Sequence, residues 1–235
     1  PAYCPQPVRT PFRSSIMTRL YPHNNGCIKN NVKLKEEIPT LVEMLEQSGD
    51  ESYKSAYMGK WHLGDEIIKQ HRFGEWVSIM DHLRRDYSRA EYKKHHSDYY
   101  HYLIENDFEP DQSEGGFPYF SNGFDRHIPK KYTRPYFLAS RAEDFIKHHK
   151  NNNFILYIGF QNPHPPYSSC NDDLYPPEDI ELPPNFNFEF DNSAPRKCKY
   201  NRLYQKDKGR MYPLQTEKDW RKIISNYWGQ VTLVD

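Results

Sequence analysis

The amino-acid sequence predicts an α/β protein in which a mostly parallel sheet lies between helices. Two segments with helical spacing are each followed by an apolar segment of the strand type, and the second of these runs directly into a polar, proline-rich loop. Alternation of helix and strand favours a sheet with helices on its faces. Ligands of open α/β sheets bind at the loops that follow the strands, so we expect a functional site there.

The first half of the chain is expected to contain two helices and a strand. Residues 12–20 and 37–48 repeat apolar side chains at helical spacing. Pro11 suits a first helical turn, and Gly49 suits a helix end. Residues 53–64 are expected to form a short buried strand that ends in a glycine-bounded loop. The apolar stripes of the two helices are expected to consist of Phe12, Ile16 and Leu20, and of Leu41, Met44 and Leu45.

The second half is expected to repeat this order. Residues 134–150 have the spacing of a helix, and residues 154–160 form a continuous apolar run typical of a central strand buried on both faces. The run leads into a loop at 161–167. Residues 171–218 are rich in proline and are expected to be largely irregular, and a last helix is expected from Lys218 onward. The inward positions of the 134–150 helix are expected to be Phe137, Ala142, Phe145 and Ile146.

Composition excludes several function classes. The 235 residues suffice for one sizeable core, and 32 basic residues balance 32 acidic ones, which argues against a nucleic-acid partner held by bulk charge. No apolar run approaches the roughly 18 residues that a membrane-spanning helix needs. The four cysteines form no C-x-x-C pair, so no structural zinc site is expected, while disulfides and oligomeric state stay open. The chain begins without Met and stops inside an expected helix, so we expect both ends to be cuts.

Three short segments are expected to lie close together at one edge of the sheet. They are the helix start at 9–14 and the two strand ends at 59–64 and 161–167. Taken singly, each has an ordinary structural explanation, but together they bring two cations and two imidazoles to one point. Such a set suits a tetrahedral oxyanion ester, because cations and helix N–H groups neutralise charge and a histidine can protonate the leaving oxygen. The candidate residues are Arg13, Lys60, His62 and His164.

These segments carry a resemblance to a known family. The segment RTPFRSSIMTR (9–19) is similar to the signature C-x-P-x-R followed by T-G, YMGKWHLG (57–64) is close to G-K-W-H-L-G, and NPHPPY (162–167) is similar to P-H-x-P-[YF]. Weaker similarities occur at 175–186 and 226–235. The motifs keep their order over almost the whole chain and resemble those of the sulfatase family, within the alkaline-phosphatase superfamily.

The resemblance implies a fold and a domain organisation. The fold would be an alkaline-phosphatase-like α/β/α sandwich with a mostly parallel central sheet, incomplete in this chain. Residues 1–235 would form part of a catalytic domain, and residues 65–135 an insertion that shapes the substrate rim, where Asp81 is a candidate for substrate binding. The ligand would be a small-molecule or carbohydrate sulfate ester. The compartment of many family members is exported, periplasmic or lysosomal.

The resemblance also implies roles for the candidate residues. Family members use a formylglycine hydrate, made from the signature cysteine, as the nucleophile on sulfur. Arg13 would hold that hydrate, Lys60 would bridge nucleophile and sulfate, and His62 would assist breakdown of the sulfated intermediate. His164 would bind sulfate or protonate the leaving group. A divalent cation, most commonly Ca²⁺, would be held by carboxylate and amide pairs that we expect before Pro1 and after Asp235, with no metal ligand inside this chain.

The chain departs from the family pattern at the nucleophile. Position 9, where the cysteine should stand, is Arg9, and Cys4 lies too early to replace it, because the motif's Pro and Arg would then fall on a glutamine and a valine. Arginine stays protonated and is no nucleophile. Arg19 and Arg72 likewise stand where the family usually has glycine. We therefore expect the chain as written to be inactive.

Three interpretations stay open at this point. The first is a sulfuric ester hydrolase by ancestry, with the three arginines reflecting an altered gene or sequence. The second is a non-catalytic protein that binds sulfate or a sulfated ligand in a pocket enriched in positive charge. The third is a phosphodiester or phosphonate monoester hydrolase, because the superfamily shares this pocket.

Overall fold

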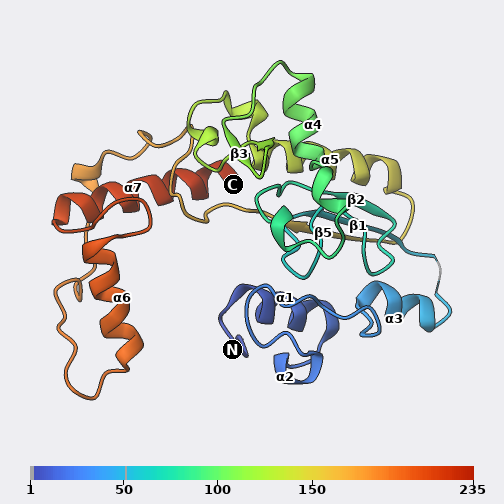
Figure 1. The fold of residues 1–235 in the computed structure, drawn as a ribbon, viewed down its shortest axis with the longest axis horizontal. Helices are drawn as coiled ribbons and strands as arrows, with labels where there is room; N and C mark the ends of the chain where they lie inside the picture. The colour runs from blue at the N-terminus through green and yellow to red at the C-terminus, as the bar shows by residue number, and fades with distance from the viewer. Residues whose placement is uncertain (1–2, 51) are drawn as a thin grey trace. The chain divides into compact units, whose positions relative to one another are not determined.

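The computed structural model describes residues 3–50 and 52–235 (Figure 1). The chain divides into two compact units. The first unit comprises the residues up to Ser121 together with Tyr136–Gln161, and the second comprises Asn122–Pro135 and Asn162–Asp235. Each unit has its own secondary structure and is described by itself.

A parallel three-stranded sheet organises the first unit (Figure 1). Its strands are β1 (Lys54–Gly59), β2 (Glu75–Val77) and β5 (Phe154–Gly159), in the order β2-β1-β5. Both neighbours run parallel to β1, and β1 pairs with β5 in a register that places Gly59 opposite Gly159. The predicted α/β class with a mostly parallel sheet is confirmed.

Helices and turns surround this sheet in the first unit. The helices are α1 (Arg9–Thr18), α2 (Pro22–Asn25), α3 (Leu41–Gln47), α4 (Asp98–Glu105) and, from its third residue on, α5 (Arg134–His149). Short 3₁₀ turns lie at Arg84–Asp86 and Tyr92–Lys94, and β3 (Gln112–Glu114) pairs antiparallel with β4 (Phe117–Tyr119). Local capping explains two of the helix starts: Thr40 and Glu43 form a capping box on α3, and Ser97 caps α4 by accepting the amide hydrogen of Tyr100.

Aromatic residues of β1 and its neighbours form the core on one face of the sheet. Tyr57 is fully buried and stacks on Tyr157 of β5 with ring centroids 5.1 Å apart. Trp61 and Trp76 pack against Tyr57 at 4.8 and 4.9 Å. The remaining buried members of this cluster are Met17, Cys27, Leu34, Val42, Leu63 and Phe73. β1 therefore buries Tyr57 among aromatic side chains of its neighbours, close to the loop that carries Lys60 and His62.

The second unit consists of helices and ordered loops. It contains α6 (Arg196–Asp207) and α7 (Glu217–Val234), with 3₁₀ turns at Phe124–Arg126, Lys130–Tyr132 and Pro177–Asp179. Thr216 and Asp219 form a capping box at the start of α7, as expected for a helix beginning near Lys218. The prediction that 171–218 is largely irregular is wrong for α6. That helix buries none of its residues and is only weakly amphipathic, so hydrophobic periodicity could not reveal it.

The helix at the signature segment is confirmed, but its apolar stripe is not its buried face. Phe12, Ile16 and Leu20 are exposed, whereas the buried face consists mainly of small and polar residues. These polar residues are satisfied locally, because Thr18 donates to the Ser14 carbonyl at 2.7 Å and Asn25 of α2 donates to Ser14 Oγ at 3.0 Å. Small side chains allow α1 to approach α2 and the β1 loop closely.

Two other packing predictions need correction. Leu41 is exposed and Val42 takes the buried position of α3; on α5, Phe137, Ala142 and Phe145 are buried as predicted but Ile146 is 44% exposed. The segment 154–160 is a strand, but within the residues that the structure describes β5 lies at a sheet edge and β1 takes the centre. Four of the six β5 residues are only half-buried as a result.

The segment 65–135 contributes to the sheet as well as to the surface. Its residues 75–77 form β2, which pairs directly with β1. Part of the segment is therefore built into the first unit's core, and its role as a substrate rim stays a prediction.

In the described part of the chain, no helix combines the length and the apolar character that crossing a bilayer requires.

Candidate functional site

The first turn of α1 and the loop after β1 meet at His62. Thr10 Oγ1 donates its hydrogen to the His62 carbonyl at 2.9 Å and lies 3.0 Å from His62 Nδ1. Because the single hydroxyl hydrogen of Thr10 goes to a carbonyl, the Thr10–His62 ring contact requires the proton on Nδ1. The neutral His62 ring then presents Nε2 as its unprotonated, basic nitrogen. Thr10 and His62 are both buried.

Arg13 binds the same loop from the second turn of α1. Its Nη1 donates to the Lys60 carbonyl at 2.6 Å and to the Tyr57 hydroxyl at 3.0 Å. Gly159 of β5 makes room for this approach, because a Cβ at that position would lie 2.7 Å from the Lys60 carbonyl oxygen and 3.1 Å from Arg13 Nη1. The carboxyl ends of β1 and β5 thus hold Arg13 in place.

Glu66 binds the backbone of the loop that follows β1. Its carboxylate accepts the amide hydrogens of Trp61 at 2.8 Å and of His62 at 2.7 Å, and it is fully buried. These bonds hold His62 in a left-handed backbone conformation with φ of 60°. Burial raises the pKa of Glu66, while its hydrogen bonds and the nearby Lys60 oppose that rise. Sequence reasoning missed Glu66, although an acidic residue just after K-W-H-L-G is a signal for capping the backbone of that turn.

The charges at this point are predominantly positive. Burial lowers the pKa of Lys60 to about 8, with Glu66 opposing and Arg9 and Arg13 adding to the shift. Burial, followed by the charges of Lys60, Arg9 and Arg13, lowers the pKa of His62 to about 3. At neutral pH the site therefore holds guanidinium and ammonium cations beside a neutral imidazole. An anion would relieve this repulsion.

Arg9 occupies the first position of α1. The side chain is exposed, and its charge acts on both Lys60 and His62. The structure therefore brings Arg9, Arg13, Lys60 and His62 together, as the sequence predicted for the last three of them. Arg9 adds to the positive charge at the position where the family pattern predicts a cysteine.

The two other departing arginines occupy left-handed backbone positions. Arg19 is the C-cap of α1 with φ of 59°, and Arg72 has φ of 57°. Residues other than glycine are disfavoured in this region of φ and ψ. The conformations account for glycine at both positions in the family pattern. Arg72 also pairs with Glu46 of α3 at 3.1 Å.

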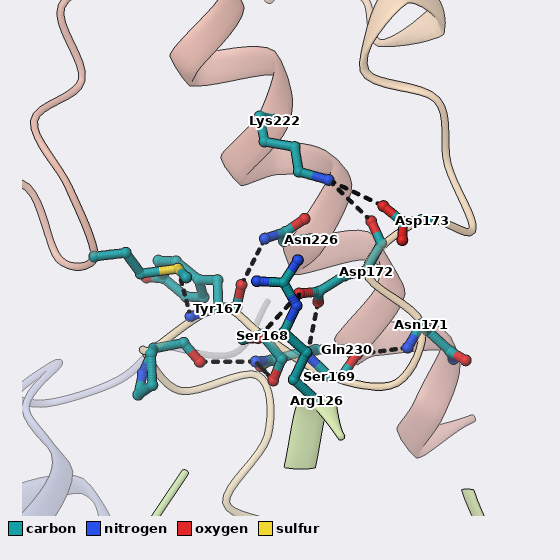
Figure 2. A network of polar contacts seen from close by, with 12 residues as sticks. Arg126, Tyr167, Ser168, Ser169, Asn171, Asp172, Asp173, Lys222, Asn226 and Gln230 are labelled. Atoms are coloured by element: carbon teal, nitrogen blue, oxygen red, sulfur yellow. Dashed lines mark hydrogen bonds and ion pairs between the residues drawn. The ribbon is translucent and has the colours of Figure 1, made fainter. Parts of the chain in front are cut away.

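His164 lies in the second unit and is half-buried. Its Nδ1 lies 2.6 Å from the Pro165 carbonyl oxygen. The chain that follows His164 is bound by side chains of α7, and Figure 2 shows this network. His164 is thus part of an ordered loop of its own unit.

Asp81, the candidate for substrate binding, takes part in an internal network. It accepts hydrogens from the Ser97 amide at 2.9 Å and the Ser97 hydroxyl at 2.6 Å, and His96 and Arg84 lie at 3.4 and 3.9 Å. Burial pushes the pKa of Asp81 upward, but the contacts with His96 and Ser97 outweigh burial and leave it lowered. These contacts give Asp81 a structural role at the start of α4, and its role in specificity stays a prediction.

Gln161 is a second residue that sequence reasoning did not single out. It lies two residues beyond the end of β5 and is 7% exposed. Among the residues that the structure describes, neither its amide oxygen nor its amide nitrogen has a hydrogen-bond partner. A buried amide without partners costs free energy, so this group is suited to a bound ligand.

One cavity of the first unit is lined by His62, and another lies away from it beside α3. One of about 140 Å³ is lined by His62 together with Asn31, Lys33, Gly64, Asp65, Glu66, Leu83, Asp86 and Ser88. Another, of about 680 Å³, lies beside α3 at the amino ends of the strands, and its carboxylates are Glu36, Glu37, Glu43, Glu46 and Asp50. Despite its size, the second suits an anionic ester poorly, because five carboxylates repel it.

The described residues do not form a metal site by themselves. Within 3–50 and 52–235, no group of three or more His, Cys, Asp or Glu side chains is arranged to hold a metal ion. A hard cation such as Ca²⁺ needs six to eight oxygen ligands. The residues present therefore do not fit a calcium site, and ligands from outside this chain stay a prediction.

The family model described as Sulfatase matches residues 1–235. The chain belongs to the sulfatase family. A sulfatase-family relative, the ulvan-active sulfatase of Formosa agariphila, is 28% identical over 193 residues, which cover 79% of this chain and 32% of the relative. The chain thus spans about a third of that relative's length.

Solved structures support the fold of this sulfatase-family chain. A phosphonate monoester hydrolase from Silicibacter pomeroyi matches with a TM-score of 0.61 at 16% identity, covering 99% of this chain and 48% of that one. A protein in complex with its substrate D-glucosamine-2-N,6-O-disulfate matches with a TM-score of 0.51 at 18% identity, covering 99% and 51%. The predicted alkaline-phosphatase-like fold, incomplete in this chain, is confirmed.

Proposed function

We propose that this chain carries a sulfatase-type pocket that binds a sulfate ester and does not cleave it through a formylglycine. The observation that carries the proposal is the convergence of Arg9, Arg13 and Lys60, whose positive charges add to the effect of burial in lowering the pKa of Lys60 and of His62. Cations held at a helix start beside backbone N–H groups suit a sulfate oxyanion. Arg9 adds binding energy for the anion and supplies no nucleophile.

The supporting residues keep the roles that the family resemblance implies. Lys60 and Arg13 bind sulfate oxygens, and the Nε2 of neutral His62 accepts a hydrogen bond from the ligand. His164 binds sulfate or faces the leaving oxygen. In a protein that contains the remaining part of the domain, we propose that a divalent cation, calcium by resemblance, completes the pocket, and that the compartment is exported, periplasmic or lysosomal.

The substrate class that we propose is a sulfated carbohydrate. The relative is described as active on ulvan, and one structural neighbour is bound to a disulfated glucosamine. The polar segment 65–135, with its tyrosines, histidines and basic residues, supports such a ligand as a rim.

Isothermal titration tests the binding proposal. Inorganic sulfate and glucosamine 6-sulfate are titrated into the full chain, into Lys60→Met and into Lys54→Met, a control that removes an exposed lysine from the opposite end of β1. We expect binding by the chain and the control, and about tenfold or greater weakening in Lys60→Met, because a charge-assisted hydrogen bond is lost. Absence of binding heat in the unaltered chain, or equal affinity in Lys60→Met, overturns the proposal.

A second candidate function is an active sulfuric ester hydrolase whose natural codon 9 encodes cysteine. It is favoured because Arg13 binds the Lys60 carbonyl, and Lys60 and His62 lie close enough to position 9 for the charge of Arg9 to act on both. Resequencing the coding DNA through codon 9 separates the two candidates: a cysteine codon supports the hydrolase, and an arginine codon in an intact frame supports the binding protein.

A third candidate, a phosphonate monoester hydrolase, is raised by the structural neighbour from Silicibacter pomeroyi. Arg9→Cys, made in the longest open frame containing this chain and in a host that forms formylglycine, is assayed with aryl sulfate and with aryl phosphonate esters. Faster turnover of the sulfate supports sulfatase ancestry. Faster turnover of the phosphonate supports the third candidate.

A further inference from the structure

Two side-chain amides of α7 bind the chain directly after His164. Gln230 Nε2 donates to the Pro166 carbonyl at 2.9 Å and to the Ser168 carbonyl at 3.1 Å. Asn226 Nδ2 donates to the Tyr167 carbonyl at 2.9 Å. Asn226 and Gln230 lie one helical turn apart on the same face of α7, and Figure 2 shows both directed at this loop. Three successive carbonyls are thus held by one face of one helix.

Independent contacts order the next part of the same loop, and one of them joins it to α7. Asp172 accepts hydrogens from the Ser168 hydroxyl at 2.9 Å and the Ser169 amide at 2.6 Å. Asn171 Nδ2 donates to the Gly229 carbonyl at 3.2 Å, and a Cβ on Gly229 would lie 2.5 Å from the Asn171 carbonyl oxygen. The loop and the helix therefore touch backbone to backbone, which leaves the amides little freedom to shift.

The state of the His164 ring depends on the backbone that these amides hold. His164 Nδ1 lies 2.6 Å from the Pro165 carbonyl oxygen, and a carbonyl can only accept, so Nδ1 carries the proton. The other ring nitrogen, Nε2, then carries no proton. The Pro165 carbonyl belongs to the peptide unit that leads into Pro166, whose own carbonyl is bound by Gln230.

We propose that Asn226 and Gln230 are positioning residues that set the tautomer and orientation of His164 through the Pro165–Ser168 backbone. The proposal rests on the proposed function, in which Nε2 of His164 meets the sulfate or the leaving oxygen. Both residues are at least 96% buried, and within the described part of the chain Asn226 Oδ1 and Gln230 Oε1 have no hydrogen-bond partner. Burying these oxygens without a partner costs folding free energy, which supports a role of the two amides beyond packing. An apolar residue of the same size would fill the space without that cost.

Nitrogen-15 NMR of the His164 ring in the full chain, without ligand, tests the proposal. Gln230→Met keeps the side-chain length and removes the donor, and Asn226→Asp keeps the shape and replaces the donor by an oxygen. The control is Lys222→Met, which removes contacts from the same helix to the Asp172 carbonyl and to Asp173 at 3.4 and 3.3 Å but none to residues 166–168. We expect the Nδ1-protonated fraction of neutral His164 to fall in the first two variants and to be unchanged in the control.

The result that overturns the proposal is an unchanged His164 tautomer in a folded Gln230→Met or Asn226→Asp protein, as judged by circular dichroism. An equal tautomer change in Lys222→Met also overturns it, because the effect would then be a general loosening of the loop. If Gln230→Met does not fold, Asn226→Asp decides alone. The readout requires no ligand, so it can fail while sulfate binding holds, and sulfate binding can fail while the tautomer effect is present.

Discussion

At the scale of single residues, Arg9 acts on two buried groups at once. Its charge contributes to the low pKa of Lys60 and of His62. In Arg9→Ala we expect the pKa of both groups to rise, because one of the cations that repel their charged forms is gone. An NMR titration of the His62 ring and the Lys60 ammonium measures the change.

The matched control for this effect is Arg89→Ala. Arg89 is an exposed arginine of the same unit that pairs with Glu91 at 3.7 Å, and its charge is not among those acting on Lys60 or His62. Equal pKa values in Arg9→Ala and the unaltered chain would contradict the electrostatic account of this site.

The pKa of Lys60 also predicts how sulfate binding depends on pH. Below about pH 8 Lys60 is an ammonium ion, and above that it loses its charge. We therefore expect sulfate affinity to be highest below pH 8 and to fall as the pH rises through that value. Titration calorimetry at several pH values measures this dependence.

Lys60→Arg provides the discriminating comparison, because a guanidinium keeps its charge throughout this range. We expect its sulfate affinity to be nearly independent of pH between 7 and about 9. A fall in that variant as steep as in the unaltered chain would assign the pH dependence to another group.

At the scale of elements, the end of α1 carries backbone strain. Arg19 caps the helix in the left-handed conformation, which costs a non-glycine residue roughly 1 kcal/mol. We expect Arg19→Gly to raise the free energy of unfolding by about 1 kcal/mol, measured by urea denaturation. Lys208→Gly is the control, because Lys208 caps α6 with φ of −122°, a conformation without strain. Glycine there only increases the entropy that the chain loses on folding, so we expect a lower free energy of unfolding.

The contrast between α1 and α6 also shows which elements a sequence reveals. The 134–150 helix and the strand at 54–59 were predicted closely, because their apolar spacing follows their burial. α6 was missed because no residue of it is buried. In α1 the exposed stripe is apolar and the buried face is polar, because hydrogen bonds to α2 and to the β1 loop replace hydrophobic contact.

At the scale of the whole molecule, the buried neutral His62 links stability of the first unit to pH. Its pKa is about 3 in the folded chain and about 6.5 in an unfolded one, so the unfolded state binds more protons between these values. Stability contributed by this residue is complete above pH 6.5 and is lost as the pH falls toward 3. Hydrogen exchange of the β1 amides, corrected for intrinsic rates, measures the change in the first unit alone.

His62→Gln is the comparison for this prediction, since glutamine keeps a donor and an acceptor without a titrating ring. We expect a shallower loss of β1 protection between pH 6.5 and 4 in this variant. An identical pH profile in both proteins would assign the acid sensitivity to carboxylates and exclude His62 as its source.

The sequence by itself determined the α/β class, the family resemblance and the candidates Arg13, Lys60 and His62, because each is expressed in local spacing and in short motifs. It also places an arginine at position 9, where the family pattern predicts a cysteine. Only the tertiary structure decided that Glu66 holds the His62 backbone, that Thr10 sets the His62 tautomer, and that Gln161 is buried without partners. The amides of α7 belong to the same group, because they contact residues about 60 positions earlier in the chain. Hydrogen bonds between residues far apart in the sequence leave no periodic pattern along it, so they become visible only when folding brings those residues together.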